Sequence, residues 1–170
     1  VAIARAFSGD PRVLICDEPT SALDVSVQAA ILNLLVELQA KRQVSYVFIS
    51  HDVGVVRYLS DRIAVLYLGQ VMEIGPAEAV FSGPHHPYTE ALLSAVPAID
   101  GQQIERVKLE GEIPSAMHPP GGCVFHTRCP RKIGPVCEQE VPQYAALGDG
   151  HAVKCHLRPD QLPHQRGRTP

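Results

Sequence analysis

Residues 13–24 read VLICDEPTSALD, an apolar run of four residues that ends at two adjacent carboxylates and a turn. Bounded by Pro11 and Pro19, this run has the length of a short buried strand in a parallel sheet. Open α/β sheets place ligands at the carboxyl ends of their strands, where Asp17 and Glu18 stand. At such a turn both carboxylates can approach one phosphate–metal centre, one as metal partner and one as base. The pattern predicts a nucleotide-hydrolysis site, and its alternative is a pair of solvated acids before a proline turn.

A second strand is expected at Val44–Ser50, and His51 follows it at the sheet edge that carries Glu18. Between the two strands, apolar side chains recur at helical spacing, which predicts an amphipathic helix from Val25 to about Lys41. This β-α-β alternation is typical of a parallel sheet flanked by helices. The stripe expected to pack on the sheet consists of Val27, Ile31, Leu34, Leu35 and Leu38.

Shorter elements surround this unit. Two edge strands, Ile63–Leu68 and Val71–Ile74, are expected to form a hairpin that turns at Gly69-Gln70. Gln70 and Glu73 are interpreted as solvated hairpin residues, and Cys16 as a small core residue. Further helices are expected at Val1–Phe7, Val53–Leu59, Ala77–Phe81 and Tyr88–Ala95.

Together these motifs resemble the ATP-binding subunit of an ABC transporter. Residues 13–18 are similar to the Walker B strand of that family, residues 21–24 to its D-loop and His51 to its switch histidine. Residues 1–6 resemble the helix that follows the signature peptide of the family. The resemblance covers residues 1 to about 75 and implies part of a P-loop NTPase-type sheet.

The resemblance also implies a role for each site residue. Asp17 would hold Mg²⁺, through water, and Glu18 would polarise the water that attacks the γ-phosphate of ATP. His51 would donate to the γ-phosphate and sense its loss. Ser21 and Asp24 would face a second ATPase subunit, because two such domains enclose two nucleotides in this family.

Two other motifs of the family are absent from these 170 residues: the G-x-x-x-x-G-K-[ST] phosphate loop and the L-S-G-G-Q signature. A phosphate loop cradles the anion with backbone N–H groups and a lysine. We therefore expect the chain to be the C-terminal part of a longer protein and to hydrolyse ATP poorly by itself. The alternative is a catalytically inactive remnant or a metal-binding regulatory module.

Composition limits the partners. The 15 basic and 18 acidic residues give a net charge of −3 without a basic stripe, which argues against nucleic acid. No apolar run approaches the length of about 20 residues that spans a bilayer. Association with the cytoplasmic face of the plasma membrane is therefore expected through permease subunits.

The amino-acid composition changes near Pro97: ten of the 15 prolines and eight of the 13 glycines lie from there onward. This predicts a boundary between residues 1–96, the ATPase part, and residues 97–170, a Cys/Pro/Gly-rich extension. Two segments, residues 83–89 (GPHHPYT) and residues 122–130 (GCVFHTRCP), resemble the oligopeptide/dipeptide branch of the ABC ATPases.

The extension holds four cysteines within 33 residues. A loop-rich segment of this kind needs a covalent cross-link or a bound metal to stabilise it. Two disulfides, a zinc ion and an iron–sulfur cluster are the candidates, with reduced thiols as the alternative. The resemblance implies an iron–sulfur cluster in some family members. The thiols belong to Cys123, Cys129, Cys137 and Cys155, and the nearby His126, His151 and His156 are expected to be mostly exposed.

The sequence thus predicts the C-terminal part of an ATPase that powers import of oligopeptides or dipeptides. Glutathione, nickel or antimicrobial-peptide transport would use very similar subunits, because the binding protein and the permease select the substrate. A DNA-repair or translation ATPase is disfavoured, since such proteins usually lack the two branch-specific segments.

Overall fold

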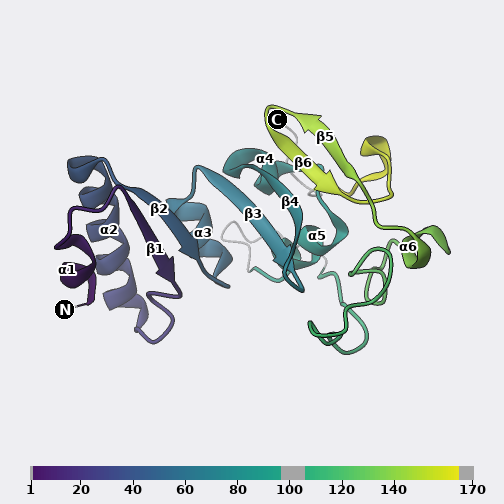
Figure 1. The fold of residues 1–170 in the computed structure, drawn as a ribbon, viewed down its shortest axis with the longest axis horizontal. Coiled ribbons are helices and arrows are strands. Elements are labelled where there is room, and N and C mark those ends of the chain that lie inside the picture. The colour runs from purple at the N-terminus through teal and green to yellow at the C-terminus, as the bar shows by residue number, and fades with distance from the viewer. Residues whose placement is uncertain (1, 97–105, 165–170) are drawn as a thin grey trace. The chain divides into compact units, whose positions relative to one another are not determined.

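The computed structural model describes residues 2–96 and 106–164 and divides into two compact units, Val1–Ser60 and Asp61–Pro170. Both units combine helices with strands (Figure 1), which confirms the mixed α/β class. No helix in the described part of the chain is long and apolar enough to cross a membrane.

The first unit contains a two-stranded parallel sheet and three helices. Its strands pair from Val13 with Ser45 to Asp17 with Ile49, so their carboxyl ends meet at one edge, as predicted. The elements are α1 (Ala2–Phe7), β1 (Val13–Asp17), α2 (Val25–Arg42), β2 (Ser45–Ile49) and α3 (Val53–Leu59).

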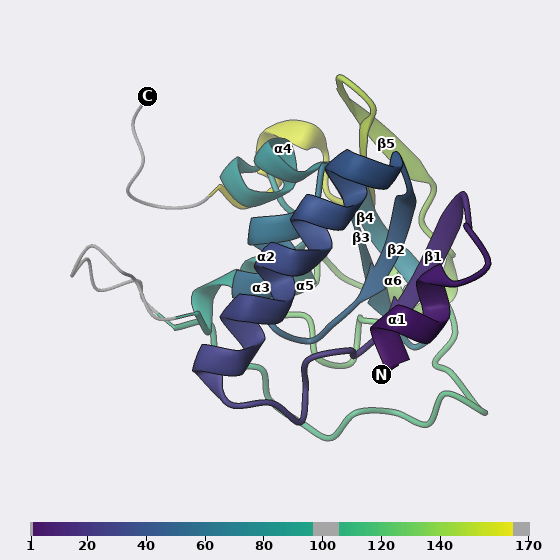
Figure 2. The same ribbon diagram turned by 90° about the vertical axis from the view of Figure 1, so that its left-hand side faces the viewer.

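One face of this sheet is covered by α1 and α2 (Figures 1 and 2). The Tyr46 ring meets Phe7 of α1 edge to face, and its hydroxyl donates to the Leu35 carbonyl of α2 at 2.8 Å. Leu35 is 1% exposed and anchors α2. The predicted stripe is partly wrong, because Val27 and Leu34 are exposed; Leu32 and Leu35 are the buried members of α2.

The other face of the β1–β2 sheet is open within this unit. Val13 and Ile15 are 58% and 69% exposed, and Val47 and Ile49 beside them are about half exposed. The expectation of a fully buried strand is therefore wrong for this chain. Alternation explains the result, since successive side chains of a strand point to opposite faces and only the face of Cys16 meets a helix.

The second unit is built on a four-stranded antiparallel sheet in the order β3-β4-β6-β5. The predicted hairpin is confirmed, although its turn lies one residue earlier, at Leu68-Gly69, where both residues have positive φ as a type I′ turn requires. The elements are β3 (Arg62–Tyr67), β4 (Gln70–Pro76), α4 (Ala77–Ser82), α5 (Pro87–Ser94), α6 (Val136–Gln139), β5 (Tyr144–Gly148), β6 (His151–Lys154) and η1 (Pro159–Gln161).

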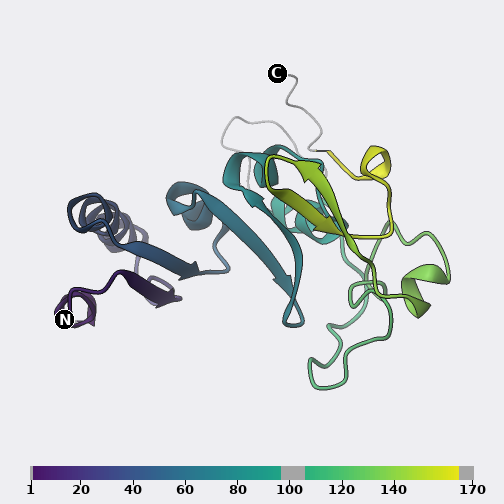
Figure 3. The same ribbon diagram turned by 45° about the horizontal axis from the view of Figure 1, so that its top comes forward.

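Residues late in the chain complete this sheet. The hairpin β5–β6 (yellow-green in Figure 3) adds β6 to β4 through the pairs Glu73–Val153 and Ile74–Ala152. The predicted boundary at residues 96/97 falls inside the second unit, next to residues 97–105, which lie outside the described residues. As a boundary between an ATPase part and an extension, it stays a prediction.

The core of the second unit is aromatic. Phe125 is fully buried, and its ring lies 5.2 Å from the ring centroids of both Tyr67 and Tyr88. Met72 of β4 packs in the same cluster. A segment without helix or strand thus supplies the central side chain for β3, β4 and α5.

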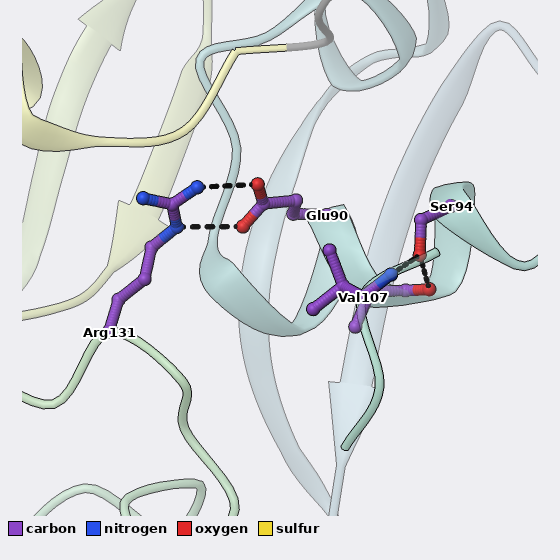
Figure 4. A network of polar contacts seen from close by, with 5 residues as sticks. Glu90, Ser94, Val107 and Arg131 are labelled. Atoms are coloured by element: carbon purple, nitrogen blue, oxygen red, sulfur yellow. Dashed lines mark hydrogen bonds and ion pairs between the residues drawn. The ribbon is translucent and has the colours of Figure 1, made fainter. Parts of the chain in front are cut away.

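Two polar contacts bind later segments to α5 (Figure 4). Arg131 forms a bidentate ion pair with Glu90, with N–O distances of 2.6 and 2.8 Å. The Ser94 hydroxyl accepts a hydrogen bond from the Val107 N–H at 3.0 Å and donates to the Ala91 carbonyl. The helix, which precedes residues 97–105, therefore holds two segments that follow them.

Candidate functional site

The carboxyl ends of β1 and β2 bring two of the predicted site residues together. The Glu18 carboxylate lies 2.9 Å from Nδ1 of His51, across the edge where the parallel strands end. The hydrogen bond and the negative charge of Glu18 raise the pKa of His51, and the charge of Asp52 acts in the same direction. Both side chains are exposed, with 48% of Glu18 and 75% of His51 open to solvent.

The backbone at Glu18 explains this approach. Its φ of 44° lies in the left-handed region, which a residue with a long side chain rarely adopts. The Glu18 N–H still donates to the Ile49 carbonyl at 2.9 Å, so the turn begins while the strands remain paired. Uncommon backbone conformations of this kind cluster at functional sites. Asp17, the last residue of β1, keeps its place in the ladder opposite Ile49.

Ser21 and Asp24 shape the segment that follows. The Ser21 hydroxyl and N–H both donate to the Glu18 carbonyl, at 3.1 and 3.3 Å. Asp24 is the N-cap of α2, because its carboxylate accepts the Val27 N–H at 2.9 Å. Both residues are exposed. Their expected contact with a second subunit stays a prediction.

A buried carboxylate in the second unit was not anticipated. Glu73 of β4 is 0% exposed, so its interpretation as a solvated hairpin residue is wrong. Its Oε1 lies 2.8 Å from Nε2 of His151, and its Oε2 accepts the His86 N–H at 2.7 Å. Burial raises the pKa of Glu73, and the hydrogen bonds from His86 and His151 oppose that effect.

The histidines around Glu73 are buried as well. His151 is 5% exposed, which corrects the expectation that it faces solvent. His85 and His86 are each 1% exposed, and burial lowers the pKa of His85 to about 4 and that of His86 to about 3. His86 is also the N-cap of α5, because its Nδ1 accepts the Tyr88 N–H at 3.0 Å. The H-H-P-Y-T segment thus has a structural role: its histidines are buried, and His86 caps α5. The two adjacent histidines are the sequence feature that could have indicated this role.

The four cysteines of the predicted cluster are free thiols that lie close enough to interact electrostatically. Cys123 donates its backbone N–H to the Cys137 carbonyl at 2.9 Å. Burial raises the pKa of Cys129 to about 12 and that of Cys155 to about 11, and the charges of the other thiols add to this. The Cys129 and Cys155 thiols are therefore protonated near neutral pH.

The half-buried His126 and His156 hydrogen-bond to backbone carbonyls, of Cys123 and Glu140 respectively, each at 2.9 Å. Within residues 2–96 and 106–164, no three His, Cys, Asp or Glu side chains form a group that could hold a metal ion. As arranged, the four thiols do not form a ligand set. A metal at this place would require the thiols to move, and its binding would release the protons of Cys129 and Cys155.

Comparisons with known proteins agree with the motifs. Residues 72–137 match the family model described as "Oligopeptide/dipeptide transporter, C-terminal region", a range that includes the H-H-P-Y-T segment and three of the four cysteines. The chain is 48% identical over 160 residues to the oligopeptide transport ATP-binding protein AppF of Bacillus subtilis; this match covers 92% of the chain and 48% of that protein.

Two further relatives are named for shorter peptides. The chain is 51% identical over 156 residues to the dipeptide transport ATP-binding protein DppF of Escherichia coli, covering 91% of the chain and 46% of that protein. It is 49% identical over 157 residues to the di/tripeptide transport ATP-binding protein DppF of Pseudomonas aeruginosa, covering 92% and 48%. The chain spans about half the length of the curated relatives it matches. Over that half, the chain is similar to oligopeptide/dipeptide transporter ATP-binding proteins.

Proposed function

We propose that this chain supplies part of an ATP-hydrolysing subunit that energises import of oligopeptides or dipeptides through a membrane permease. The observation that carries the proposal is the 2.9 Å contact of Glu18 with His51 at the carboxyl edge of two parallel strands. The names of the relatives, which are ATP-binding proteins of peptide transport, support the substrate class.

Each residue has a proposed role in phosphoryl transfer. Glu18 accepts a proton from the attacking water and orients it in line with the γ-phosphate. His51 donates to the γ-phosphate, and its contact with Glu18 couples the position of the base to the presence of that phosphate. Asp17 would hold Mg²⁺, through water, and the ion supplies neutralisation of phosphate charge when bound.

The proposed partners follow from this role. A second ATPase subunit, identical or paralogous, would meet Ser21 and Asp24, both of which are exposed. The permease subunits would hold the complex at the cytoplasmic face of the membrane. Glutathione, nickel and antimicrobial peptides remain alternative cargoes, because the ATPase does not select the substrate.

The test is uptake of a radiolabelled dipeptide by cells in which the gene that encodes this chain carries Glu18→Gln. We expect uptake to fall at least about a hundredfold, since the amide cannot accept the proton of the attacking water. Glu37→Gln is the matched control, because Glu37 is an exposed residue of α2 paired with Lys41, and uptake should not change. Undiminished uptake in the Glu18 variant would contradict the proposal. A chain that takes no part in ATP hydrolysis, and whose function depends instead on its four cysteines, would also contradict it.

A metal centre at the four cysteines is a second proposal, for an iron–sulfur cluster or a zinc ion. Its support is the presence of four free cysteines within 33 residues of a loop-rich segment, which would have to move together to form a ligand set. Anaerobic purification followed by metal analysis tests it, with Cys129→Ser as the variant and Cys16→Ser, in the other unit, as the control. Iron with sulfide, or zinc, that Cys129→Ser loses would support the centre. Metal-free protein under these conditions would remove it.

A further inference from the structure

The side-chain contacts of Gln28 with Asp52 and of Tyr58 with Asn33 join α2 to opposite ends of α3. At the first turn, the side-chain amide of Gln28 donates to Oδ2 of Asp52 at 3.4 Å. Near the last turn, the Tyr58 hydroxyl donates to Oδ1 of Asn33 at 2.7 Å. Only the first of these contacts touches the residue that directly follows His51.

Asp52 fixes the backbone on which His51 stands. Its Oδ1 accepts the N–H groups of Gly54 and Val55, at 2.9 and 3.2 Å, and so caps α3. Its own N–H donates to the Ser50 hydroxyl at 3.0 Å. Oδ1 of Asp52 is thus used by the helix cap, and Oδ2 accepts the hydrogen bond from Gln28. These two sets of contacts hold the turn from β2 into α3.

Gln28 in turn stands at the start of α2. Its backbone N–H donates to the Asp24 carbonyl at 2.8 Å, in the first turn that Asp24 caps. Hydrogen bonds therefore run without a gap from the exposed segment at residues 21–24, through Gln28 and Asp52, to the residue beside His51.

We propose that Gln28 is a positioning residue that holds His51 against Glu18 and links this pair to the segment at residues 21–24. The inference rests on the proposed function, and it adds regulation to that site. A displacement of residues 21–24 by a second subunit moves the start of α2, and Gln28 transmits the movement to His51. The γ-phosphate contact of His51 thereby depends on the state of the partner interface.

The test measures His51 in this chain without nucleotide, so its outcome is separate from that of the transport assay. The imidazole is titrated by NMR in the unaltered chain and in Gln28→Met, which keeps shape and charge but removes the donor. Glu18 and Asp52, the charged groups that act on His51, are unchanged in the variant. We expect the His51 midpoint to fall toward its ordinary value of 6.5, since His51 moves away from Glu18.

Asn33→Leu is the matched control, because it removes the other polar contact between α2 and α3. It should leave the His51 midpoint unchanged, whereas a merely structural role for Gln28 would make both variants shift it equally. Amide spectra of α2 and α3 verify that each variant is folded, and Gln28→Ala replaces Gln28→Met if the methionine disturbs them. An unchanged midpoint in the Gln28 variant would overturn the inference.

Discussion

A single carboxylate holds three segments of the second unit together. Glu73 of β4 accepts hydrogen bonds from His151 of β6 and from the backbone at the start of α5, and no part of it reaches solvent. Removing one member of such a buried set leaves the others without partners, which costs more than the hydrogen bond itself contributes. Glu73 is thus a structural residue with consequences for the whole sheet.

We predict that Glu73→Gln lowers the free energy of unfolding of the second unit by about 3 kcal/mol. Glutamine can still accept from His151, but its NH₂ group then faces the His86 N–H, a donor opposite a donor. Urea denaturation followed by near-UV circular dichroism measures the change. Glu112→Gln, at an exposed position, is the control and should stay within about 0.5 kcal/mol. Equal stability of the two variants would show that Glu73 has no such role.

The site residues that could be identified from the sequence lie in short motifs, in which the function determines the order of neighbouring residues. Glu18 and His51 could be predicted to meet, because parallel strands bring their carboxyl ends to one edge. Glu73 could not, since an acidic residue in a short hairpin strand is ordinarily exposed, and only the pairing of β4 with β6, from 78 residues further along the chain, buries it. The sequence feature that could have indicated the burial of Glu73 is His151, the histidine of β6 whose Nε2 lies 2.8 Å from the Glu73 carboxylate.

At the scale of elements, the start of α5 makes the second unit sensitive to acid. The low pKa values of His85 and His86 mean that both stay neutral in the folded state down to about pH 4. The unfolded chain binds these protons already near pH 6.5, so the unfolded state holds more protons in this window and stability falls as the pH drops. Glu73 acts in the opposite sense, because its raised pKa lets the folded state bind a proton more tightly than the unfolded chain does.

We predict that stability falls between pH 6.5 and pH 4, with each histidine contributing on the order of 3 kcal/mol before the opposing effect of Glu73; urea denaturation at several pH values measures the loss. The test variant is His86→Asn, because asparagine retains an N-cap side chain but does not titrate. Its stability should depend less steeply on pH than that of the unaltered chain. The same slope in both proteins would mean that His86 is not the source of the effect.

The loop that carries Cys123 depends on one glycine. Gly122 has a φ of 64°, and a Cβ built on it would lie 2.6 Å from the Cys137 carbonyl oxygen, which is backbone and cannot swing away. The close approach lets the Cys123 N–H reach that carbonyl. Gly111 also has a positive φ, of 78°, but nothing lies within 4 Å of its Cβ position.

We therefore predict that Gly122→Ala destabilises the second unit by at least about 3 kcal/mol, whereas Gly111→Ala costs about 1 kcal/mol from backbone strain alone. Thermal and urea denaturation of the two variants give the comparison directly. Because both positions share the left-handed backbone, the difference between them isolates the close contact with the backbone of residues 137 and 138. Similar losses in the two variants would rule out that contact as the cause.

Within residues 1–96, periodicity predicted which elements form but not which of their faces are covered, and it predicted none of the later elements α6, β5, β6 and η1. The helices α2 and α3 and both hairpin strands begin and end within a few residues of their expected limits. The open face of β1 and the exposed Val27 of α2 were not foreseen, because an apolar side chain has the same spacing whether or not this chain supplies a neighbour for it.

For the whole molecule, the two units differ in the apolar core that each contains. Among the described residues, the buried hydrophobic ones of the first unit are Cys16, Leu32, Leu35, Val44 and Val55, while the second unit buries about twice as many, around Phe125 and Val153. The second unit is also longer, but the first unit leaves the apolar side chains on one face of its sheet exposed, so less apolar burial offsets the conformational entropy of β1 and β2. The stability of the first unit should therefore be the lower of the two.

We predict that hydrogen exchange separates the units. Amides of β1 and β2 should exchange at least about tenfold faster than those of β4 and β6, because local opening of the first unit costs less free energy. Mass spectrometry of peptic fragments, at a pH where both units are folded, measures the rates. Glu73→Gln provides the internal check: it should accelerate exchange in β4 and β6 and leave β1 and β2 unchanged. Uniform protection across both units, or acceleration of all four strands together, would mean that the chain unfolds as one cooperative body.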